Sequence, residues 1–453
     1  MLNTILTGSF IEAGGLIFTL LYFLLIIGVC IQIISDTTSP SKTIGYLLLI
    51  FFFPPLGVVL YLSIGVTYRN RRMYSKKITN DEDLEEQLLK YTQNLKREAM
   101  GSGNPVLEQY KGLAYNIASE NVHWLSCYNN ITLFKNGEEK FPAVLEAIEN
   151  AKDSIHIEYY IVRNDQIGNA IKEALIRKAK EGVKVRFIYD DYGGKEVRRK
   201  YSKELRAAGA EVYPFRKILF IFWANRLNYR NHRKIIVVDG KVGFVGGINI
   251  GDEYINTPGQ EKEYLRDTHI KLEGYSCYAL QHIFLSDWNF CARQNLEPTE
   301  ALFPPIDKGD FCSKTVQIVA SGPDSREPLI MHSILQAIAL SKKEVLITTP
   351  YFIPSESVLT MLKIAARSQV KVKILVPEKT NSWPVRMASR ALYRNLFEAG
   401  VEIYHYHRGF IHAKTSVFDR SVAMIGTANM DNRSFDLNFE VNAVVYDKEV
   451  AEE

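Results

Sequence analysis

The sequence predicts an α/β protein with two similar halves, each a mixed sheet flanked by helices, related by a pseudo-twofold axis and preceded by a two-helix transmembrane hairpin. Three observations support this class. A motif occurs twice: each histidine is followed two positions later by lysine, seven later by aspartate and seventeen later by asparagine. Alternating helical and strand patterns precede both copies, which is typical of sheets covered by helices. Two long apolar runs open the chain.

The apolar runs lie in residues 1–68, from Gly14 to Ile34 and from Ile44 to Val66, joined by the polar link Ser35 to Thr43. Each run is long enough to cross a bilayer as a helix. A cleaved signal peptide fits poorly, because no lysine or arginine precedes the first run and a second run follows directly. Pro54 and Pro55 predict a kink in the second helix and leave a re-entrant loop open as an alternative.

Basic residues cluster directly after the second run: Arg69, Arg71, Arg72, Lys76 and Lys77. Such clusters mark the cytoplasmic end of a membrane helix. The sequence therefore predicts a multi-pass protein of the cytoplasmic membrane, with both ends of the hairpin inside and the large body on the cytoplasmic side.

Residues 69–105 are expected to form a basic and amphipathic linker. Within it, apolar residues at helical spacing predict a helix from Asn80 to Met100, with Asn80 as its N-cap. The apolar positions are Leu84, Leu88, Tyr91 and Leu95. Gly101 to Pro105 then has the composition of a loop, so the folded body is expected to begin near there.

The body reads as an internal duplication, with a first half at residues 106–310 and a second at 311–453. Helical and strand patterns alternate in the same order from Phe141 to Tyr189 and from Ser333 to Val376. The first half carries an extra segment, Arg216 to Arg226, with six consecutive apolar residues from Ile218. Burial under the sheet is the preferred interpretation of this hexad, and insertion into the membrane interface or an acyl channel is the alternative.

The motif copies begin at His232 and His412. Residues two apart share one face of a strand, so His232 is expected beside Lys234, and His412 beside Lys414. An imidazole and an ammonium group on one surface indicate a phosphate site.

The other motif residues are expected to shape this site. Asp239 is followed by glycine and stands between apolar runs, which predicts a tight hairpin. It lies an odd number of residues from His232, so in a regular strand it is expected to face away from that histidine. Asp239 and Asp419, although part of the catalytic motifs, are therefore interpreted as braces of the turn and strand. Glycines after the return strands are expected to bring Asn249 and Asn429 back to the histidine and lysine face.

Composition limits the alternatives. A formal net charge of +4 over 453 residues is mild and does not indicate nucleic-acid binding. The five cysteines are scattered without a Cys-x-x-Cys pair, so neither a disulfide framework nor a metal site is indicated.

The paired motifs resemble those of the phospholipase D superfamily, and their surroundings are similar to bacterial cardiolipin synthases. The similar segments are NHRKI, GFVGGINIGDEY and RDTH in the first half, and TPYFIP, GFIHAK and GTANMDNRSFDLNFE in the second. The resemblance covers almost the whole chain, including its apolar start, and implies two halves that share one cleft. Members of this family continue after the last strand with a further helix and a short apolar tail, whereas this sequence ends at Glu453.

The resemblance implies phosphodiester exchange without a metal or other cofactor. The two lysines and two asparagines would neutralise and orient the phosphate oxygens. By analogy, His232 is expected to attack phosphorus and His412 to act as acid and base. A carboxylate is expected to hold each histidine ring: Glu440 is expected to hold the His412 ring, and Asp267 the His232 ring. Further strand-end residues are either substrate contacts or core: Glu158, Tyr159, Tyr160, Tyr351 and Phe352.

The expected activity is transfer of a phosphatidyl group between two phosphatidylglycerol molecules, giving cardiolipin and glycerol at a bacterial membrane. The expected partners are phosphatidylglycerol and the bilayer, and not nucleic acid. A phospholipase D that uses water as acceptor is the first alternative, because residue types alone do not select the acceptor. A nuclease is disfavoured by the apolar runs and mild charge. A catalytically inactive scaffold is disfavoured because both motifs are intact.

Overall fold

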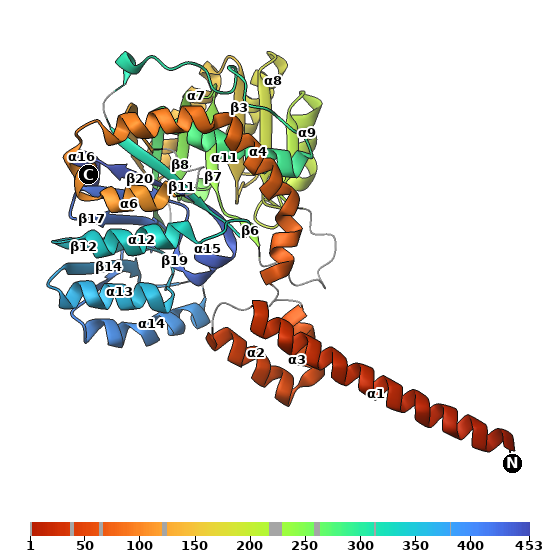
Figure 1. The fold of residues 1–453 in the computed structure, drawn as a ribbon. Helices are drawn as coiled ribbons and strands as arrows, with labels where there is room; N and C mark the ends of the chain where they lie inside the picture. Colours follow the sequence, from red (N-terminus) through yellow and green to blue (C-terminus); the bar gives the residue numbers. More distant parts are fainter. Residues whose placement is uncertain are drawn as a thin grey trace. The chain divides into compact units, whose positions relative to one another are not determined.

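The computed structural model describes residues 2–36, 40–62, 67–119, 125–216, 229–257, 263–311, 314–380 and 382–453. Two compact units are present: the described residues up to Ser75 form the first, and those from Lys76 onward form the second. Figure 1 shows the ribbon, with the first unit in red and orange. Each unit is described by itself.

The first unit begins with a long apolar helix, α1 (Leu2–Asp36). Its segment Gly15–Ser35 has a mean hydropathy of 2.7, and no other described helix is both long and apolar enough to cross a membrane. Phe18 is 73% exposed, and the apolar side chains around it are exposed as well. An apolar surface of this kind is unstable in water but suits lipid, and the helix agrees with the first predicted span.

The second apolar run differs from the continuous helix that the sequence predicts. It forms α2 (Pro40–Phe52) and α3 (Pro54–Leu60), separated at Phe53. At 1.5 Å per residue, the 13 residues of α2 extend about 20 Å, which is short of a hydrocarbon core of about 30 Å. The break predicted from Pro54 and Pro55 is confirmed, because proline lacks the N–H that a continuing helix needs. A second membrane crossing stays a prediction.

Helix α4 (Thr67–Met100) corrects the predicted start of the linker helix. It begins well before Asn80, so Asn80 is an interior residue and not an N-cap. The predicted apolar face is confirmed at Leu84, Leu88 and Leu95, all of which are buried. Lys77, expected at the membrane exit, is 3% exposed and its ammonium group pairs with carboxylates of the second unit.

The first half of the second unit contains a seven-stranded mixed sheet of order β2-β10-β8-β7-β3-β4-β5. Strands β3, β4 and β5 run parallel, and the other neighbours are antiparallel. Helices α7 (Asn136–Asn150), α8 (Gln166–Lys180) and α9 (Ser202–Ala207) accompany it. The strands are β2 (Asn129–Lys135), β3 (Ser154–Tyr159), β4 (Lys184–Tyr189), β5 (Glu211–Pro214), β7 (Lys234–Val238), β8 (Val242–Gly246) and β10 (Thr268–Gly274).

The second half repeats this arrangement, with β20-β18-β17-β12-β14-β15 in place of β10-β8-β7-β3-β4-β5. The predicted duplication is therefore confirmed in strand order and direction. Helices α12 (Leu329–Leu340), α13 (Glu356–Arg367) and α14 (Trp383–Phe397) accompany this sheet. Its strands are β11 (Thr315–Ser321), β12 (Glu344–Thr348), β14 (Lys371–Pro377), β15 (Glu402–Tyr406), β17 (Thr415–Phe418), β18 (Val422–Gly426) and β20 (Asn438–Tyr446).

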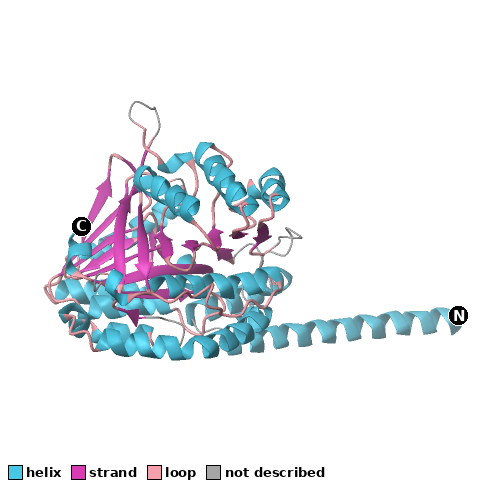
Figure 2. Cartoon of the chain, turned by 90° about the horizontal axis from the view of Figure 1, so that it is seen from above, coloured by secondary structure: helices cyan, strands magenta, loops and turns pink. Residues whose placement is uncertain are grey.

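The start of the expected first half packs with the second half instead. Strand β1 (Leu125–Ser126) pairs with β11 at the edge of the second sheet. Helices α5 (Pro105–Gln109) and α6 (Lys111–Ile117) place Leu107, Leu113 and Ile117 in the hydrophobic core of that half. Figure 2 shows the helices and sheets of the chain from above.

Short strands connect the two halves reciprocally. Strand β6 (Arg230–Asn231), just before His232, runs parallel beside the start of β20. Strand β16 (Gly409–Ile411), just before His412, runs parallel beside β9 (Tyr264–Arg266) of the first half. Each half therefore pairs with the short strand that leads into the other half's histidine motif.

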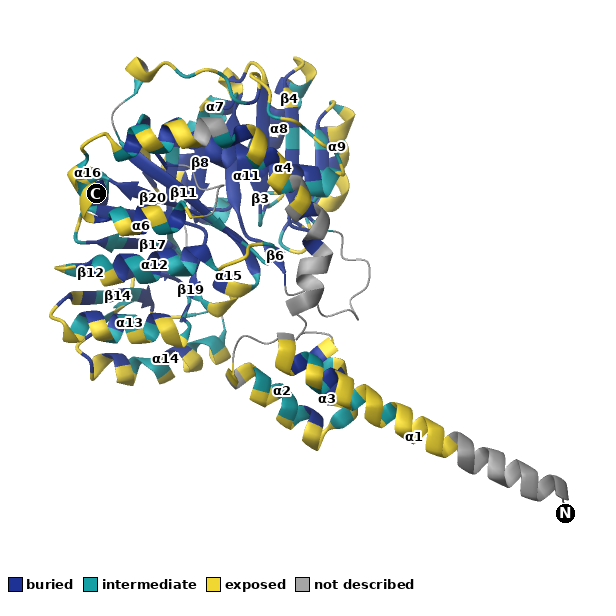
Figure 3. Cartoon of the chain, in the orientation of Figure 1, coloured by how far each residue is buried: buried dark blue, intermediate teal, exposed yellow. Residues whose placement is uncertain are grey.

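Helix α11 (Ser276–Ala292) is almost wholly buried, as its dark blue colour in Figure 3 shows.

Candidate active site

A cavity of about 530 Å³ lies in the second unit, and both motif histidines line it. Residues of both halves form its wall, which confirms that the two motifs share one cleft. The lining residues are Tyr160, Ile161, Arg230, His232, Asn249, Tyr254, Tyr351, Ile353, Ser382, Val385, His412, Asn429, Asp431, Asn432, Arg433 and Asn438.

Each motif strand ends in a tight turn and pairs with the strand that follows it. In the first half, β7 and β8 are antiparallel neighbours, and Asp239 and Gly240 between them both have positive φ, at 50° and 63°. In the second half, Asp419 and Arg420 have the same handedness, at 51° and 48°. Two successive positive φ angles give the turn whose twist matches paired strands, so the predicted hairpins are confirmed.

Asp239 and Asp419 are not among the residues that line the cavity, and they brace the fold, as the sequence predicts. Oxygens of Asp239 accept hydrogen bonds from the backbone N–H groups of residues 152, 153 and 154, each at 2.8 Å. Those of Asp419 accept from residues 342, 343 and 344 at 2.7 to 3.1 Å. Each carboxylate thus ties its motif turn to the start of the neighbouring strand, β3 or β12.

The ring of His232 is held by Glu440 of the second half. His232 Nδ1 lies 2.9 Å from Glu440 Oε2. Thr427 donates its hydroxyl to the same oxygen at 2.5 Å, and Asn438 donates its amide to Glu440 Oε1 at 3.0 Å. Glu440 is fully buried. Because an ionised carboxylate only accepts hydrogen bonds, Nδ1 carries the hydrogen and Nε2 keeps a free lone pair.

The ring of His412 is held by Asp267 of the first half, with Nδ1 2.6 Å from Asp267 Oδ2. Thr268 donates its backbone N–H to Asp267 Oδ1 at 2.7 Å. The predicted pairing of Glu440 with His412 and of Asp267 with His232 is therefore wrong. Both carboxylates are histidine partners, but each serves the ring of the opposite half.

The reason for the crossed pairing is visible in the backbone. His232 N–H donates to the carbonyl of Phe439 at 2.9 Å, next to Glu440. His412 N–H donates to the carbonyl of Arg266 at 2.7 Å, next to Asp267. Gly247 allows the close approach of Asp267, because a Cβ atom there would lie 2.1 Å from Asp267 Oδ1. At the same motif position of the second half, Thr427 instead donates to Glu440.

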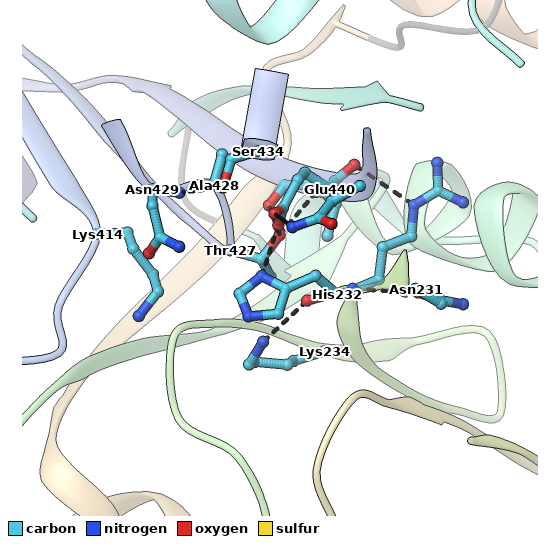
Figure 4. Close-up of polar contacts among 12 residues, drawn as sticks. Asn231, His232, Lys234, Lys414, Thr427, Ala428, Asn429, Ser434 and Glu440 are labelled. Atoms are coloured by element: carbon cyan, nitrogen blue, oxygen red, sulfur yellow. Dashed lines mark hydrogen bonds and ion pairs between the residues drawn. The ribbon is translucent and has the colours of Figure 1, made fainter. Parts of the chain in front are cut away.

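Both lysines are buried beside the rings. Lys234 donates from Nζ to the carbonyl of His232 at 2.8 Å. Lys414 donates to the carbonyl of His412, and its Nζ lies 3.0 Å from His412 Nδ1. Figure 4 shows Lys234, Lys414 and Asn429 near the His232 ring, with Glu440 on its other side.

Burial weakens the basicity of both lysines, and the charge of Lys414 weakens that of Lys234 further. Burial, followed by the charge of Lys414, lowers the pKa of Lys234 to about 7. Burial lowers the pKa of Lys414 to about 8, although Asp267 and Glu440 oppose this. An anionic phosphate between the ammonium groups would reverse the effect, because opposite charge favours their protonated forms.

The histidines are held neutral and their partners ionised. Burial and then Lys414 lower the pKa of His412 to about 4, and burial also lowers that of His232. Burial alone would raise the pKa of Asp267, but Lys414 and His412 bring it below its ordinary value. Burial likewise opposes ionisation of Glu440, but His232 and Lys234 lower its pKa. A neutral imidazole with a free Nε2 has the protonation state of a nucleophile or a base.

The motif asparagines line the cavity as predicted. Asn249 donates from Nδ2 to the Tyr254 hydroxyl at 2.6 Å and accepts from the backbone N–H of Ile161 at 3.3 Å. Asn429 is held through its backbone N–H by Ser434 at 3.1 Å, whereas its buried Oδ1 has no hydrogen-bond partner among the described residues. Both amides lie where they can contact a phosphate oxygen.

Aromatic rings cover each histidine. The Tyr160 and His232 ring centroids are 4.8 Å apart, and those of Tyr254 and His412 are 5.9 Å apart, both edge to face. Tyr160 and Tyr351, for which the sequence left two readings open, line the cavity. Phe352 belongs to the core instead.

Glu158 and Tyr159 do not line the cavity. Glu158 accepts a hydrogen bond from Asn231 and lies near Arg233 and Asp287 in a buried polar cluster. The Tyr159 hydroxyl accepts a hydrogen bond from Lys140 at 2.9 Å.

Other residues of the site were not found from the sequence. Thr427, Asn438, Arg230, Tyr254 and Asp431 lie outside the His-x-Lys spacing, and only the duplicated fold brings them to the rings. Thr427 had a signal, since it stands at the motif position that Gly247 holds in the other half. The apolar hexad from Ile218 lies outside the described residues.

The folding pattern and paired motifs together define a phospholipase D-like protein. The crystal structure of phosphatidylserine synthase from Haemophilus influenzae shares the fold, with a TM-score of 0.53 over 75% of this chain and 87% of that chain at 16% identity. The family model described as "Cardiolipin synthase, PLD-like domain" matches residues 144–264 and 334–453, and the "Phospholipase_D-nuclease N-terminal" model matches 20–65.

Curated relatives cover nearly the whole chain. It is 41% identical to a cardiolipin synthase of Geobacillus thermodenitrificans, over 95% of this chain and 84% of that protein. It is 38% identical to the major cardiolipin synthase ClsA of Bacillus subtilis, over 97% of this chain and 90% of that protein. The chain therefore belongs to the cardiolipin synthase family of phospholipase D-like phosphatidyltransferases.

Proposed function

We propose that this enzyme transfers a phosphatidyl group from one phosphatidylglycerol to a hydroxyl of another, giving cardiolipin and glycerol through a phosphohistidine. The observation that carries the proposal is that two neutral, carboxylate-held imidazoles line one cavity, each with a buried lysine beside it. The names of the curated relatives support the same reaction.

In the first step, His232 Nε2 attacks phosphorus of the donor lipid. A nitrogen–phosphorus bond forms and the bond from phosphorus to the glycerol oxygen breaks. His412 gives its proton to that oxygen, so glycerol leaves neutral. The charge of the bound diester adds to that of Asp267, and both favour the protonated form of His412 that this step requires.

Lys234, Lys414, Asn249 and Asn429 stabilise the charge that develops on the non-bridging oxygens. Donors that are already in place need no reorganisation in the transition state, and burial strengthens their attraction. The residues of the site supply a nucleophile, an acid and charge stabilisation.

In the second step, a hydroxyl of another phosphatidylglycerol attacks the same phosphorus. Now neutral, His412 takes the proton of this hydroxyl, and the nitrogen–phosphorus bond breaks. Cardiolipin leaves and His232 returns to its starting state. Attack by water at this point would give phosphatidic acid instead, which is the phospholipase D reaction.

We further propose that the enzyme is a multi-pass protein of the cytoplasmic membrane with its catalytic unit on the cytoplasmic side. The apolar α1 and the basic residues after the second apolar run support this orientation. A periplasmic or external reporter inserted between residues 36 and 40 should be active, and activity of a cytoplasmic reporter there would contradict the topology.

The reaction is tested by incubating purified protein in vesicles with phosphatidylglycerol alone and separating the products. Equal amounts of cardiolipin and glycerol are expected. Phosphatidic acid with glycerol would identify a hydrolase, and absence of turnover would identify a scaffold.

A further inference from the structure

Helix α14 connects the wall of the active-site cavity to an exposed apolar surface. Val385 in its first turn, and Ser382 just before it, line the cavity. Trp383 lies between them in sequence and is 65% exposed, and Met387, one turn further along, is 46% exposed. A large apolar pair at the edge of a polar cavity is unusual on a protein surface that meets only water.

The first half has a similar feature at the equivalent place. Strands β4 and β14 occupy the same position in the two sheets, and an exposed aromatic side chain follows each in the sequence. In the first half this side chain is Tyr192, which is 60% exposed. The guanidinium carbon of Arg230 lies 4.8 Å from the Tyr192 ring centroid, and Arg230 lines the cavity. Exposed aromatic rings therefore border the cavity from both halves.

Both segments are basic. Helix α14 contains three arginines and no acidic residue; the Arg394 side chain is 87% exposed and pairs with Glu398, just after the helix, at 3.1 Å. In the first half, the π-helix Val197–Tyr201 carries Arg198, Arg199 and Lys200. Lys200 is also 87% exposed and pairs with Glu204 at 3.7 Å, and Arg198 pairs with Asp191 at 2.6 Å, so the basic residues outnumber their acidic partners. In Figure 3 the ribbons of α9, which follows this π-helix, and of α14 are partly yellow, the colour of exposed residues.

Tryptophan, tyrosine and basic side chains together favour the region where lipid headgroups meet acyl chains. Aromatic rings are amphipathic and collect at that depth. Each lysine or arginine near an anionic surface adds about 1 kcal/mol of attraction, which is about fivefold in binding. A protein partner would have to match the same surface with carboxylates around an apolar centre.

We propose that Trp383, Met387 and Tyr192, with the flanking basic residues, bind an anionic bilayer surface beside the mouth of the cavity. This inference rests on the proposed function, because it assumes that the substrate is a bilayer lipid. The docked segments deliver the headgroup to His232 and His412 without removing the lipid from the membrane. They act locally, in addition to the anchoring by α1.

The test compares the full-length wild type with Trp383→Ala/Met387→Ala in phosphatidylcholine vesicles. Long-chain phosphatidylglycerol in the bilayer is one substrate, and water-soluble dihexanoyl phosphatidylglycerol is the other. We expect the variant to lose about tenfold or more in cardiolipin formation from the bilayer lipid. Its turnover of the soluble lipid should match that of the wild type. Tyr115→Ala, at an exposed tyrosine of α6 that does not line the cavity, is the matched control and should change neither.

Equal losses with both substrates, or no loss with either, would overturn the proposal. A second measurement is independent of turnover: brominated lipids should quench part of the tryptophan fluorescence of the wild type, and Trp383→Phe should lack that part. Equal quenching in both would also overturn it. If the wild type makes no cardiolipin from either substrate, the proposed function fails, while the quenching still decides whether Trp383 meets the bilayer.

Discussion

The crossed pairing of carboxylates and histidines makes a specific prediction for Glu440→Gln. Glu440 is fully buried and accepts hydrogen bonds from His232 at 2.9 Å, Thr427 at 2.5 Å and Asn438 at 3.0 Å. A glutamine has the same shape, but its NH₂ group cannot accept. If that group faces His232, it donates to Nδ1 and drives the hydrogen to Nε2, which then has no lone pair for attack.

The expected loss follows from this change of tautomer. Replacing the carboxylate by an amide in the serine protease triad lowers kcat by about 10⁴-fold for the same reason. Glutamine still has one side-chain oxygen that can accept a hydrogen bond, so we expect a loss of about 10³ to 10⁴ in kcat. The loss of a buried charge partner also lowers stability, which thermal unfolding in detergent measures separately.

The assay separates the two histidines by their chemical roles. A phosphatidyl ester of p-nitrophenol has a good leaving group that needs no general acid. With this substrate, Asp267→Asn, which disturbs His412, should still release a rapid burst of nitrophenol. Glu440→Gln should show no burst, because His232 cannot attack. Glu449→Gln, at an exposed glutamate of α16 (Lys448–Glu452), is the control and should behave as the wild type.

The reverse result would contradict this assignment of roles to the two histidines. A normal burst in Glu440→Gln together with no burst in Asp267→Asn would make His412 the nucleophile. Loss of the burst in both variants would show that the two histidines do not have separate roles as nucleophile and general acid.

Three further predictions follow from the same geometry. In the free enzyme Lys234 and Lys414 have pKa values of about 7 and about 8, so their charge disappears as pH rises through this range and kcat/KM for phosphatidylglycerol should fall with it. Lys414→Arg keeps its charge throughout, so the fall that belongs to Lys234 should remain and the decline at higher pH should be less steep than in the wild type; a flat wild-type profile to pH 9 would contradict this. Asn429→Ala should lower kcat by about 10²-fold with a smaller change in KM, measured by steady-state kinetics, because its amide acts on charge in the transition state; a rise in KM alone would mean a binding role only. Asp419→Asn should lower stability by about 1 to 2 kcal/mol through weaker backbone hydrogen bonds. Burial opposes the ionisation of Asp419, but those backbone N–H groups lower its pKa, so the stability it adds is present above its ordinary pKa of 3.8 and disappears as pH falls below it. Unfolding temperatures measured against pH check this, and lost activity without lost stability would place Asp419 in the chemistry.

The repeated motif was enough to predict much of the fold and the core of the site. Apolar runs around Asp239 and Gly240 predict a hairpin because local turn chemistry decides it, and the structure has that hairpin. The odd spacing between His232 and Asp239 likewise indicates a brace, and the Asp239 carboxylate accepts hydrogen bonds from the backbone N–H groups of residues 152 to 154, where β3 begins.

The partners of the histidines depend on a contact that no local pattern contains. Strand β6 lies beside β20 and β16 lies beside β9, so each histidine meets a carboxylate that is far away in sequence. Sequence spacing favours a partner downstream in the same half, and here that inference gave the wrong pairs. Only the packing of one half on the other determines which carboxylate reaches which ring.

The second apolar run shows another limit of sequence patterns. Its hydropathy and length satisfy the criterion for a membrane span, but hydropathy does not report on backbone continuity. Pro54 and Pro55 start a new helix, and Ile50 and Val58 of α2 and α3 then pack with Tyr61 in a small core. Composition therefore predicted a lipid-compatible segment, and the prolines predicted that it would not be one straight helix.

The central claim is that His232 forms a covalent bond to phosphorus within a cavity that both halves build. It is tested most directly by mixing the enzyme with phosphatidylglycerol labelled at phosphorus, stopping the reaction within milliseconds in alkali, and mapping the labelled peptide. We expect label on the peptide that contains His232, stable in alkali and lost in acid. Label on His412, or turnover to cardiolipin with no labelled histidine at any time, would contradict it.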